Sequence, residues 1–404
     1  MSVRPGFRRA AIVAFAILLP VAAWALWDYV EGARLARLIR EIHDRGEPVA
    51  VYEIVPLPVP LTEEQARASR YYLAAAILAS DVYDDGKIVP DAVERFADAL
   101  VMLDRATPVD FSQLQPGTEF SYRTADFLQL SRLNAMRTES RARAGDGDAA
   151  AASLVASIRL RRVMETSTPV TWAVSADANF LSVAGVMLGE SQPSAEALRS
   201  VQEALEKATR PSVVEDGIVA MRGRAIQRFW REYFGGTVVP TARGAPRRLP
   251  LRERIMRPWR THRFVATLGD VERRLEAARQ PWPRKLDAFE VPRAGRDAPV
   301  PAIELPDPKR AATRLASDRV AIAALAVERF RRRPGGATPA SLSELSPEFL
   351  TSIPDDPFSE KPLIYRREQA GYVVYSVGAN RADDGGAVGP NESDLGLRVS
   401  ARQR

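Results

Sequence analysis

The first hydrophobic segment of the chain is a run from Ala10 to Trp27 that contains no charged residue. Three arginines, at positions 4, 8 and 9, precede it. A helix of this length, at about 1.5 Å per residue, covers roughly 27 Å, which is close to the thickness of the hydrocarbon layer of a membrane. The pattern therefore predicts a transmembrane anchor over residues 10–27, with a basic cytoplasmic tail over residues 1–9.

The same run also has features of a signal peptide that is removed after export. Pro20 interrupts it, and Ala23–Ala25 has the small-x-small pattern of a cleavage site. Leu35, Ile39 and Ile42 continue a helical spacing beyond the run, which favours one uncleaved helix that leaves the membrane and enters the body of the protein. Both alternatives place the body outside the cytoplasm. We expect a single-pass protein of the inner membrane with its body in the periplasm or an equivalent extracytoplasmic space.

Helical patterns dominate residues 28–305, which we expect to form one helical extracytoplasmic domain. A proline-rich stretch, Pro48–Pro60, is typical of an extended connector. Thr62, followed by acidic residues, is typical of a helix start, and Asp91 opens a second helix. Further helices are expected over Trp172–Leu188, from Ser194 to Leu205, and from Pro211 to Trp230.

The most regular part of this domain is Phe120–Glu165. Phe127, Leu130 and Leu133 form one apolar stripe, and a second stripe begins at Leu154. The glycines at positions 145 and 147 separate the two stripes, so the pattern predicts an antiparallel helix hairpin. The hairpin is similar to one tetratricopeptide unit, but no repeat of fixed period follows it.

The residue inventory removes several kinds of catalytic chemistry. The 404 residues include no cysteine and only two histidines, His43 and His262. Disulfides, thiolate metal sites, thiol nucleophiles and a zinc site with three histidines are therefore excluded. The chain also lacks a Gly-x-Ser-x-Gly motif, a phosphate-binding loop and a dinucleotide-binding fingerprint. This inventory favours a protein that is not an enzyme.

Positive charge is concentrated between Arg222 and Lys285, where seventeen Lys or Arg residues stand against five acids. Aromatic residues alternate with these cations. One interpretation is a surface for an anionic component of the cell envelope, centred on Arg257, Trp259, Arg260 and Arg263, with nucleic acid a less available partner outside the cytoplasm. The other is that the aromatic residues form a core and the arginines its solvated face.

The last hundred residues have a different pattern, which predicts a small α+β module over residues 306–404. A helix begins at Pro308, runs through Leu325 and ends at the Pro334–Gly336 segment. A short turn follows, and two strands, Leu363–Arg366 and Tyr372–Val377, form an antiparallel hairpin. The fold class expected for the whole chain is therefore mainly α, with a membrane helix at one end and this module at the other.

The order of motifs in residues 315–387 resembles the C-terminal module of the major pseudopilin of type II secretion systems. The residues that carry the resemblance are Phe330, Gly336, Pro339, Leu342, Leu345, Pro354, Asp356, Pro357, Phe358, Pro362, Tyr365, Gly371, Ser376, Gly378 and the Asp383–Gly386 loop. The N-terminus departs from the family, because Ala11 stands where a pseudopilin has its glutamate. The resemblance implies a reused module on a different membrane protein rather than a filament subunit.

In that family the closing loop binds calcium. By resemblance, the oxygen ligands here would come from Asn380, Asp383, Asp384 and Asp394, with Asn391 as a further candidate. The alternative is a polar turn that holds no ion, since Asp, Asn and Gly favour such turns by themselves. Calcium is the one cofactor that the sequence suggests.

Two functions are compatible with these features. The first is a membrane-anchored, non-enzymatic scaffold or interaction protein of the cell envelope, with envelope proteins or an anionic envelope surface as partners and a link to secretion. The second is an extracytoplasmic hydrolase that uses a pair of carboxylates on envelope glycan. A deep pocket holding two acids with raised pKa values would favour the second.

Overall fold

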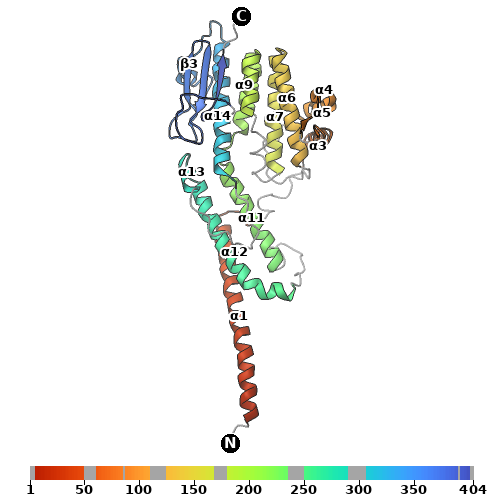
Figure 1. Cartoon of the computed structure of the whole chain (residues 1–404), viewed down its shortest axis with the longest axis vertical. Coiled ribbons are helices and arrows are strands. Elements are labelled where there is room, and N and C mark those ends of the chain that lie inside the picture. Colours follow the sequence, from red (N-terminus) through yellow and green to blue (C-terminus); the bar gives the residue numbers. More distant parts are fainter. Residues whose placement is uncertain are drawn as a thin grey trace. The chain divides into compact units, whose positions relative to one another are not determined.

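A computed structural model describes residues 5–49, 61–84, 87–109, 124–167, 180–234, 250–289, 306–389 and 392–400. The chain is mainly helical, as expected (Figure 1). It divides into two compact units, each built from separate stretches of sequence. Unit 1 comprises residues 1–54, 218–277 and 291–305, and unit 2 comprises residues 55–217, 278–290 and 306–404.

Unit 1 is built on three helices: α1 (Pro5–Asp44), the larger part of α11 (Val213–Tyr233) and α12 (Leu251–Ala278). Each contributes one apolar stripe to a common core. Phe229 of α11 stacks on Phe264 of α12, with ring centroids 4.0 Å apart. The buried residues of this core are Leu35, Ile39, Ile42, Val49, Ile226, Phe229, Tyr233, Phe264 and Leu268.

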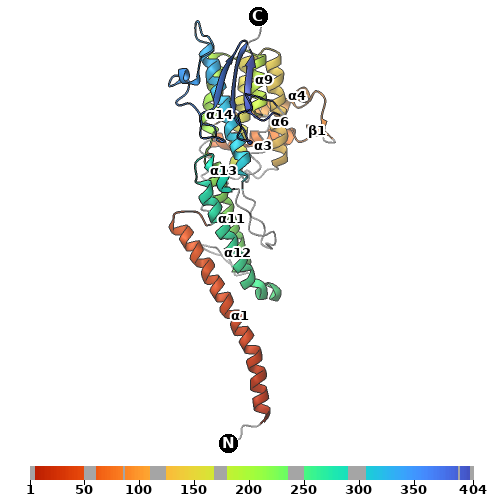
Figure 2. The same ribbon diagram turned by 60° about the vertical axis from the view of Figure 1, so that its left-hand side comes forward.

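Helix α1 is continuous (Figure 2), and the exposure of its side chains changes along its length. Large apolar side chains between Val13 and Val30 are exposed, whereas Leu35 and Ile42 are fully buried. The stretch from Val13 onward is long and apolar enough to cross a membrane. The expectation that one helix runs from the apolar segment into the body is confirmed. Pro20 lies inside the helix without ending it.

Unit 2 begins with a small helical layer. Helix α3 (Glu63–Leu78) starts at the predicted residue, because Thr62 and Gln65 form a reciprocal capping box. A two-stranded hairpin, β1 (Tyr83–Asp84) and β2 (Lys87–Ile88), separates it from α4 (Ala92–Arg95) and α5 (Ala97–Ala106). Tyr72 and Leu103 are fully buried in the core that this layer shares with the next two helices, α6 (Thr124–Arg143) and α7 (Gly147–Ser167). The predicted connector lies mostly outside the described residues.

The predicted helix hairpin is present as α6 (Thr124–Arg143) and α7 (Gly147–Ser167). Gly145, with a φ of 83°, makes the left-handed turn between them. The Asn134 amide links the helices by donating to the Ser153 carbonyl and the Ser157 hydroxyl, at 2.8 and 2.7 Å. Helix α9 (Phe180–Glu190) and helix α10 (Ala195–Ala208), capped by Ser194, follow. The first residues of the helix predicted from Trp172 lie outside the described part.

The C-terminal segment contains α13 (Arg284–Phe289), α14 (Pro308–Arg331), a short 3-10 turn η1 (Leu342–Leu345) and a sheet of three strands. Strands β3 (Ile364–Glu368), β4 (Gly371–Ser376) and β5 (Leu395–Ser400) form this antiparallel sheet, with β4 in the centre. The predicted hairpin is β3–β4, with Tyr365 opposite Val374. Strand β5 was not expected from the sequence.

The C-terminal segment shares one core with the helices that precede it, rather than forming a core of its own. Val320–Val327 of α14 and Tyr372 of β4 pack with Leu154 and Leu198 from α7 and α10. Helix α9 comes so close to β5 that a Cβ on Gly185 would lie 2.9 Å from Leu397. The division expected at residue 305 therefore differs from the units in the structure. The apolar residues of α14 are buried both by the strands that follow it and by α9 and α10, more than a hundred residues before it, which periodicity does not reveal.

Buried ion pairs connect α7 to α14 across this core. Arg161 donates to Asp318 at 2.9 Å, and both side chains are nearly inaccessible to solvent. One turn further along α7, Glu165 accepts from Arg162 at 3.3 Å and from Arg314. Burial by itself would raise the pKa of Glu165, but the positive charges of the neighbouring arginines outweigh it and lower that pKa.

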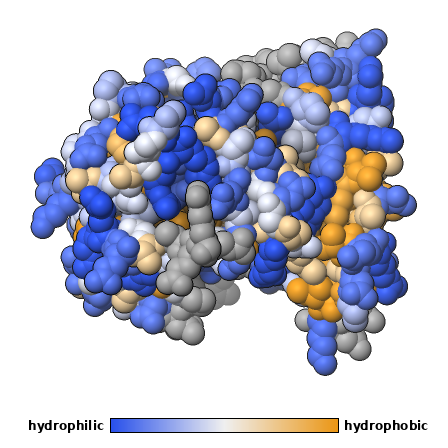
Figure 3. All heavy atoms as spheres, turned by 90° about the horizontal axis from the view of Figure 1, so that it is seen from above, coloured by the Kyte–Doolittle hydropathy of each residue, from blue (hydrophilic) through white to orange (hydrophobic). Residues whose placement is uncertain are grey.

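Most of the surface in the view of Figure 3 is hydrophilic, and hydrophobic side chains gather at one side of it. Exposed large apolar residues occur on α3 and α5. They include Leu73, Ile77, Leu78 and Val101.

We expect Asp318→Ala to destabilise unit 2 by about 3–5 kcal/mol, because Arg161 would be left buried without its counter-charge. Hydrogen exchange of α7 and α14 in the full chain measures the loss. Glu360→Ala is the matched control, since its ion pair with Arg284 is exposed on both sides and should contribute little. Equal effects of the two changes would contradict a structural role for the buried pair.

We also expect acid to remove the contribution of Glu165. Its pKa is lower in the folded chain than in the unfolded chain, so its stabilisation is complete above the ordinary glutamate pKa of about 4.3 and is lost as pH falls through the folded value. Glu165→Gln should lower the urea midpoint at neutral pH and flatten its fall below about pH 4. Glu196→Gln, on the exposed face of α10, should keep the wild-type pH profile.

Candidate functional site

The basic and aromatic cluster predicted on residues 257–263 lies on α12, beside α1, within unit 1. Figure 1 shows that α12 bends near its N-terminal end, so that its first turns run sideways while the rest runs along α1. Pro258 lies in this part of the helix. A proline inside a helix removes a backbone hydrogen bond and kinks the axis, which accounts for the bend.

Three polar contacts fix the register of α12 against α1. The Trp24 indole donates to the Ile255 carbonyl at 2.9 Å. Arg257 makes a two-pronged contact with Asp28, in which Nε donates to Oδ1 at 2.9 Å. His262 lies 3.1 Å from a carboxylate oxygen of the buried Glu31. The start of α12 is therefore level with the end of the uncharged run of α1.

The structure places the four predicted residues of the anionic-surface site on one stretch of α12. Each of its three arginines already contacts another side chain of the protein. The hydrogen bonds with Asp28 raise the pKa of Arg257. Arg260 pairs with Glu253 at 2.8 Å and donates to Tyr233. Arg263 stacks over Trp259, with 5.0 Å from the guanidinium carbon to the ring centroid. Whether this group binds an anionic surface stays a prediction.

Sequence reasoning overlooked the residues just before this cluster. Leu251 and Ile255 are exposed, as are Arg252 and Arg254. Neither arginine has an ion-pair partner among the described side chains. The available signal was a pair of apolar residues four apart, with two arginines between them, shortly before Pro258.

A second cluster of charge holds the other end of the three-helix core together. Arg222 of α11 is completely buried and lies 2.7 Å from Glu47 and 2.6 Å from Glu272. Glu272 also accepts from Arg45 at 2.6 Å. These charges join α11, α12 and the residues after α1, so they are explained by packing alone.

The four residues predicted as calcium ligands lie in or beside the loop between β4 and β5, and each has protein partners. Asp394 is buried and accepts from the backbone amides of residues 384, 386 and 387. Asp383 accepts from the Tyr375 hydroxyl at 2.9 Å. Asn380 donates to Asp384 at 2.7 Å. Asn391 lies outside the described residues.

Within the described residues, no three His, Cys, Asp or Glu side chains are grouped so that they could hold a metal ion. Calcium also accepts Asn side chains and backbone carbonyls as ligands. Calcium binding by this loop therefore stays a prediction.

Other residues of the C-terminal motif have structural roles. Asp356 is buried, and its carboxylate accepts from the Phe358 amide, the Ser376 hydroxyl and the Val377 amide at 2.7–2.9 Å. It thereby ties the Asp-Pro-Phe turn to the end of β4. Because a buried carboxylate needs several donors, the Asp and Ser of the motif depend on each other.

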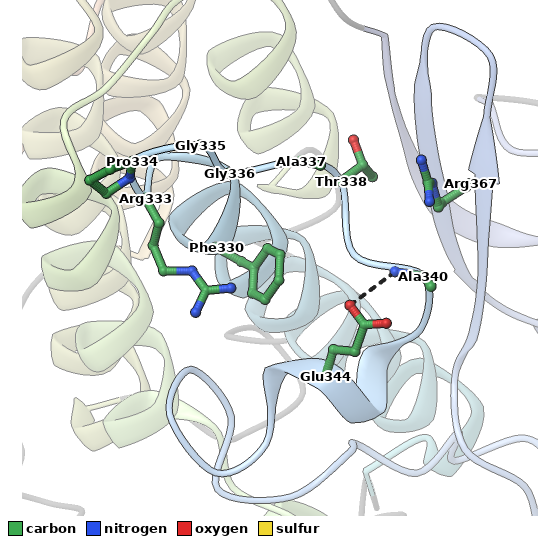
Figure 4. A pocket seen from close by; sticks show the side chains of 10 residues that line it. All are labelled: Phe330, Arg333, Pro334, Gly335, Gly336, Ala337, Thr338, Ala340, Glu344 and Arg367. Carbon is green, nitrogen blue, oxygen red and sulfur yellow. Dashed lines mark hydrogen bonds between the residues drawn. The ribbon is translucent and has the colours of Figure 1, made fainter.

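A shallow hollow of about 590 Å³ lies where α14 ends, between Phe330, Glu344 and Arg367 (Figure 4). Arg333 stacks on Phe330, with 3.7 Å from the guanidinium carbon to the ring centroid, and Glu344 accepts from the Ala340 amide at 3.2 Å. A Cβ on Gly336 would lie 2.6–2.8 Å from three backbone carbonyl oxygens. The hollow is formed by the chain reversal that follows α14.

Comparison with protein-family profiles, with curated proteins and with solved structures found no match to this chain.

The resemblance of the C-terminal loop predicts that calcium binds to the purified full chain and that Asp383→Ala with Asp384→Ala abolishes the binding. Isothermal titration calorimetry measures both. Glu392→Ala is the control, since this exposed residue lies nearby in the same loop. If titration of the wild-type chain with calcium gives no heat, the calcium prediction is wrong and the loop is a turn held by its own hydrogen bonds.

Proposed function

We propose that this chain is a single-pass membrane protein of the cell envelope whose body, outside the cytoplasm, acts by binding other envelope components. The observation that carries the proposal is the continuity of α1. Its first part exposes apolar side chains on all sides, and without a break its later part enters the core of unit 1. An anchor built in this way is a structural part of the body.

The contacts of α1 support retention of the helix over removal of a signal peptide. Cleavage after Ala25 would remove Trp24, whose indole bonds to the Ile255 carbonyl. It would also leave Asp28, the partner of Arg257, at a free and mobile N-terminus. The three arginines before the apolar run favour a cytoplasmic N-terminus and hence an extracytoplasmic body.

A binding role is supported by the chemistry of the acids. A general acid of a glycan hydrolase needs a raised pKa. The pKa values of two carboxyl groups, Glu165 and Asp383, are lowered, which is the direction opposite to that requirement. Glu165 is fully buried among arginines, which suits a structural role.

The shared core of unit 2 supports a role for the C-terminal segment as a fixed part of a scaffold. All residues of β4 are buried, and α14 supplies fourteen buried residues to the interior. A segment held this firmly is suited to presenting surface loops to a partner. In this proposal, the pseudopilin-like motif stabilises the scaffold, and its link with secretion lies in the partner that the scaffold binds.

The anchor and the topology are tested together in cells. We expect the full-length chain to remain in the membrane pellet after alkaline extraction and to retain its N-terminus, as measured by mass spectrometry. Protease added to spheroplasts should digest the body. A soluble chain that begins at Leu26 would overturn the anchor, and protection of the body from protease would overturn the orientation.

A further inference from the structure

The first turns of α12 are an unusual surface for a protein in water. Leu251 is 70% exposed and Ile255 is 56% exposed. A helix has about 3.6 residues per turn, so these two side chains share one face, and Arg252 and Arg254 project on either side of it. Such an arrangement, two apolar residues flanked by cations, is typical of a helix that lies in the surface of a membrane.

The position of these turns relative to α1 points to the same environment. The Ile255 carbonyl accepts a hydrogen bond from the indole of Trp24. Arg257 pairs with Asp28, the first charged residue after the apolar run. If residues 10–27 span the bilayer, the start of α12 is at the level where α1 leaves it. The bend near Pro258 then turns the first part of α12 away from α1 and along the membrane surface (Figure 1).

Two arginines at the start of α12 are available to pair with the phosphate of a lipid headgroup. Arg257 and Arg260 are neutralised by Asp28 and Glu253. Arg252 and Arg254 are exposed and have no ion pair among the described side chains. Their long side chains can extend to the phosphate layer while Leu251 and Ile255 insert among the upper acyl carbons.

We propose that residues 251–257 of α12 form a second, in-plane membrane contact that binds anionic lipid headgroups of the outer leaflet of the same membrane. This inference rests on the proposed anchor. The apolar pair supplies insertion, and Arg252 and Arg254 supply the preference for anionic lipid, each cation strengthening the contact about fivefold. The contact fixes the tilt of unit 1 against the membrane, which a single spanning helix does not do.

The absence of cysteine allows one environment-sensitive fluorophore to be placed at will in the full chain. Three single variants, Ile255→Cys, Ala266→Cys and Leu18→Cys, are labelled and reconstituted into nanodiscs that contain nitroxide-labelled lipid. Ala266 is an exposed residue further along α12, and Leu18 lies in the apolar run. We expect blue-shifted, quenched emission from the labels at 255 and 18, and water-like emission from the label at 266.

The outcomes separate the two proposals. Quenching at 18 with water-like emission at 255 would overturn the in-plane contact and leave the anchor intact. Water-like emission at 18 would overturn the anchor itself. Because the label replaces Ile255, Leu251→Cys provides a second probe of the same face.

The lipid preference is tested by composition. Quenching at 251 or 255 should be stronger in phosphatidylglycerol nanodiscs than in phosphatidylcholine nanodiscs, and Arg252→Gln with Arg254→Gln should remove the difference. Arg273→Gln, an exposed arginine remote from the first turns, is the control and should preserve it. Equal quenching in both lipids would overturn the recognition of anionic headgroups.

Discussion

The organisation of unit 1 depends on one constraint: α1 is a single helix that is long and apolar enough in its first part to cross a membrane and that packs into the core of the unit in its later part. From Val13 to Trp27 the helix carries no charged side chain, and after Asp28 its apolar residues form one buried stripe. Inserting a charged side chain at the centre of a bilayer costs about 2.5–3.5 kcal/mol. Charged residues of such a helix are therefore expected only outside the apolar run. Asp28 stands at the end of that run and is paired with Arg257, while Glu31 is buried one turn later. Helices α11 and α12 pack where the membrane would end.

Unit 2 is organised around α14, whose buried surface is rich in alanine. Small side chains let neighbouring helices approach closely but provide little shape to define their register. The ion pairs Arg161–Asp318 and Glu165–Arg314 occupy one end of this contact. Removing one partner of such a pair is costly, although replacing both by apolar residues often is not. Their contribution is therefore best understood as specifying which turn of α7 faces which turn of α14.

Local features of the fold were predictable from the sequence, and non-local features were not. Thr62 and Ser194 cap helices at the expected positions, and Gly145 separates the predicted hairpin. Strand β5 was overlooked although Leu395, Leu397 and Val399 alternate with other residues, because the Asp- and Gly-rich loop before it suggested the end of the module. The common core of α7, α10 and α14 was not predicted, since periodicity shows which face is buried but not what covers it.

The candidate site shows the same limit. The sequence identified the basic and aromatic stretch between Arg222 and Lys285 but did not predict helix α12, and counting cations does not show which of them are neutralised. Arg257 and Arg260 have acidic partners that are remote in sequence or a turn away, whereas Arg252 and Arg254 do not. Only the folded arrangement of α1 and α12 distinguishes the two pairs. The same arrangement shows that the exposed apolar residues at the start of α12 lie beside the end of the apolar run of α1.

The shared core of unit 2 has a consequence for the order in which the chain is made. Helix α10 ends at Ala208, but Val320 and Val399, which complete its core, are synthesised more than a hundred residues later. At about 5–20 residues per second, the ribosome needs several seconds or more to supply them. During that interval α7, α9 and α10 can pack on α6 and on one another, but their apolar residues that contact α14 and β5 have no native partner. Loss of β5 would therefore expose apolar residues of α9, a helix made long before it.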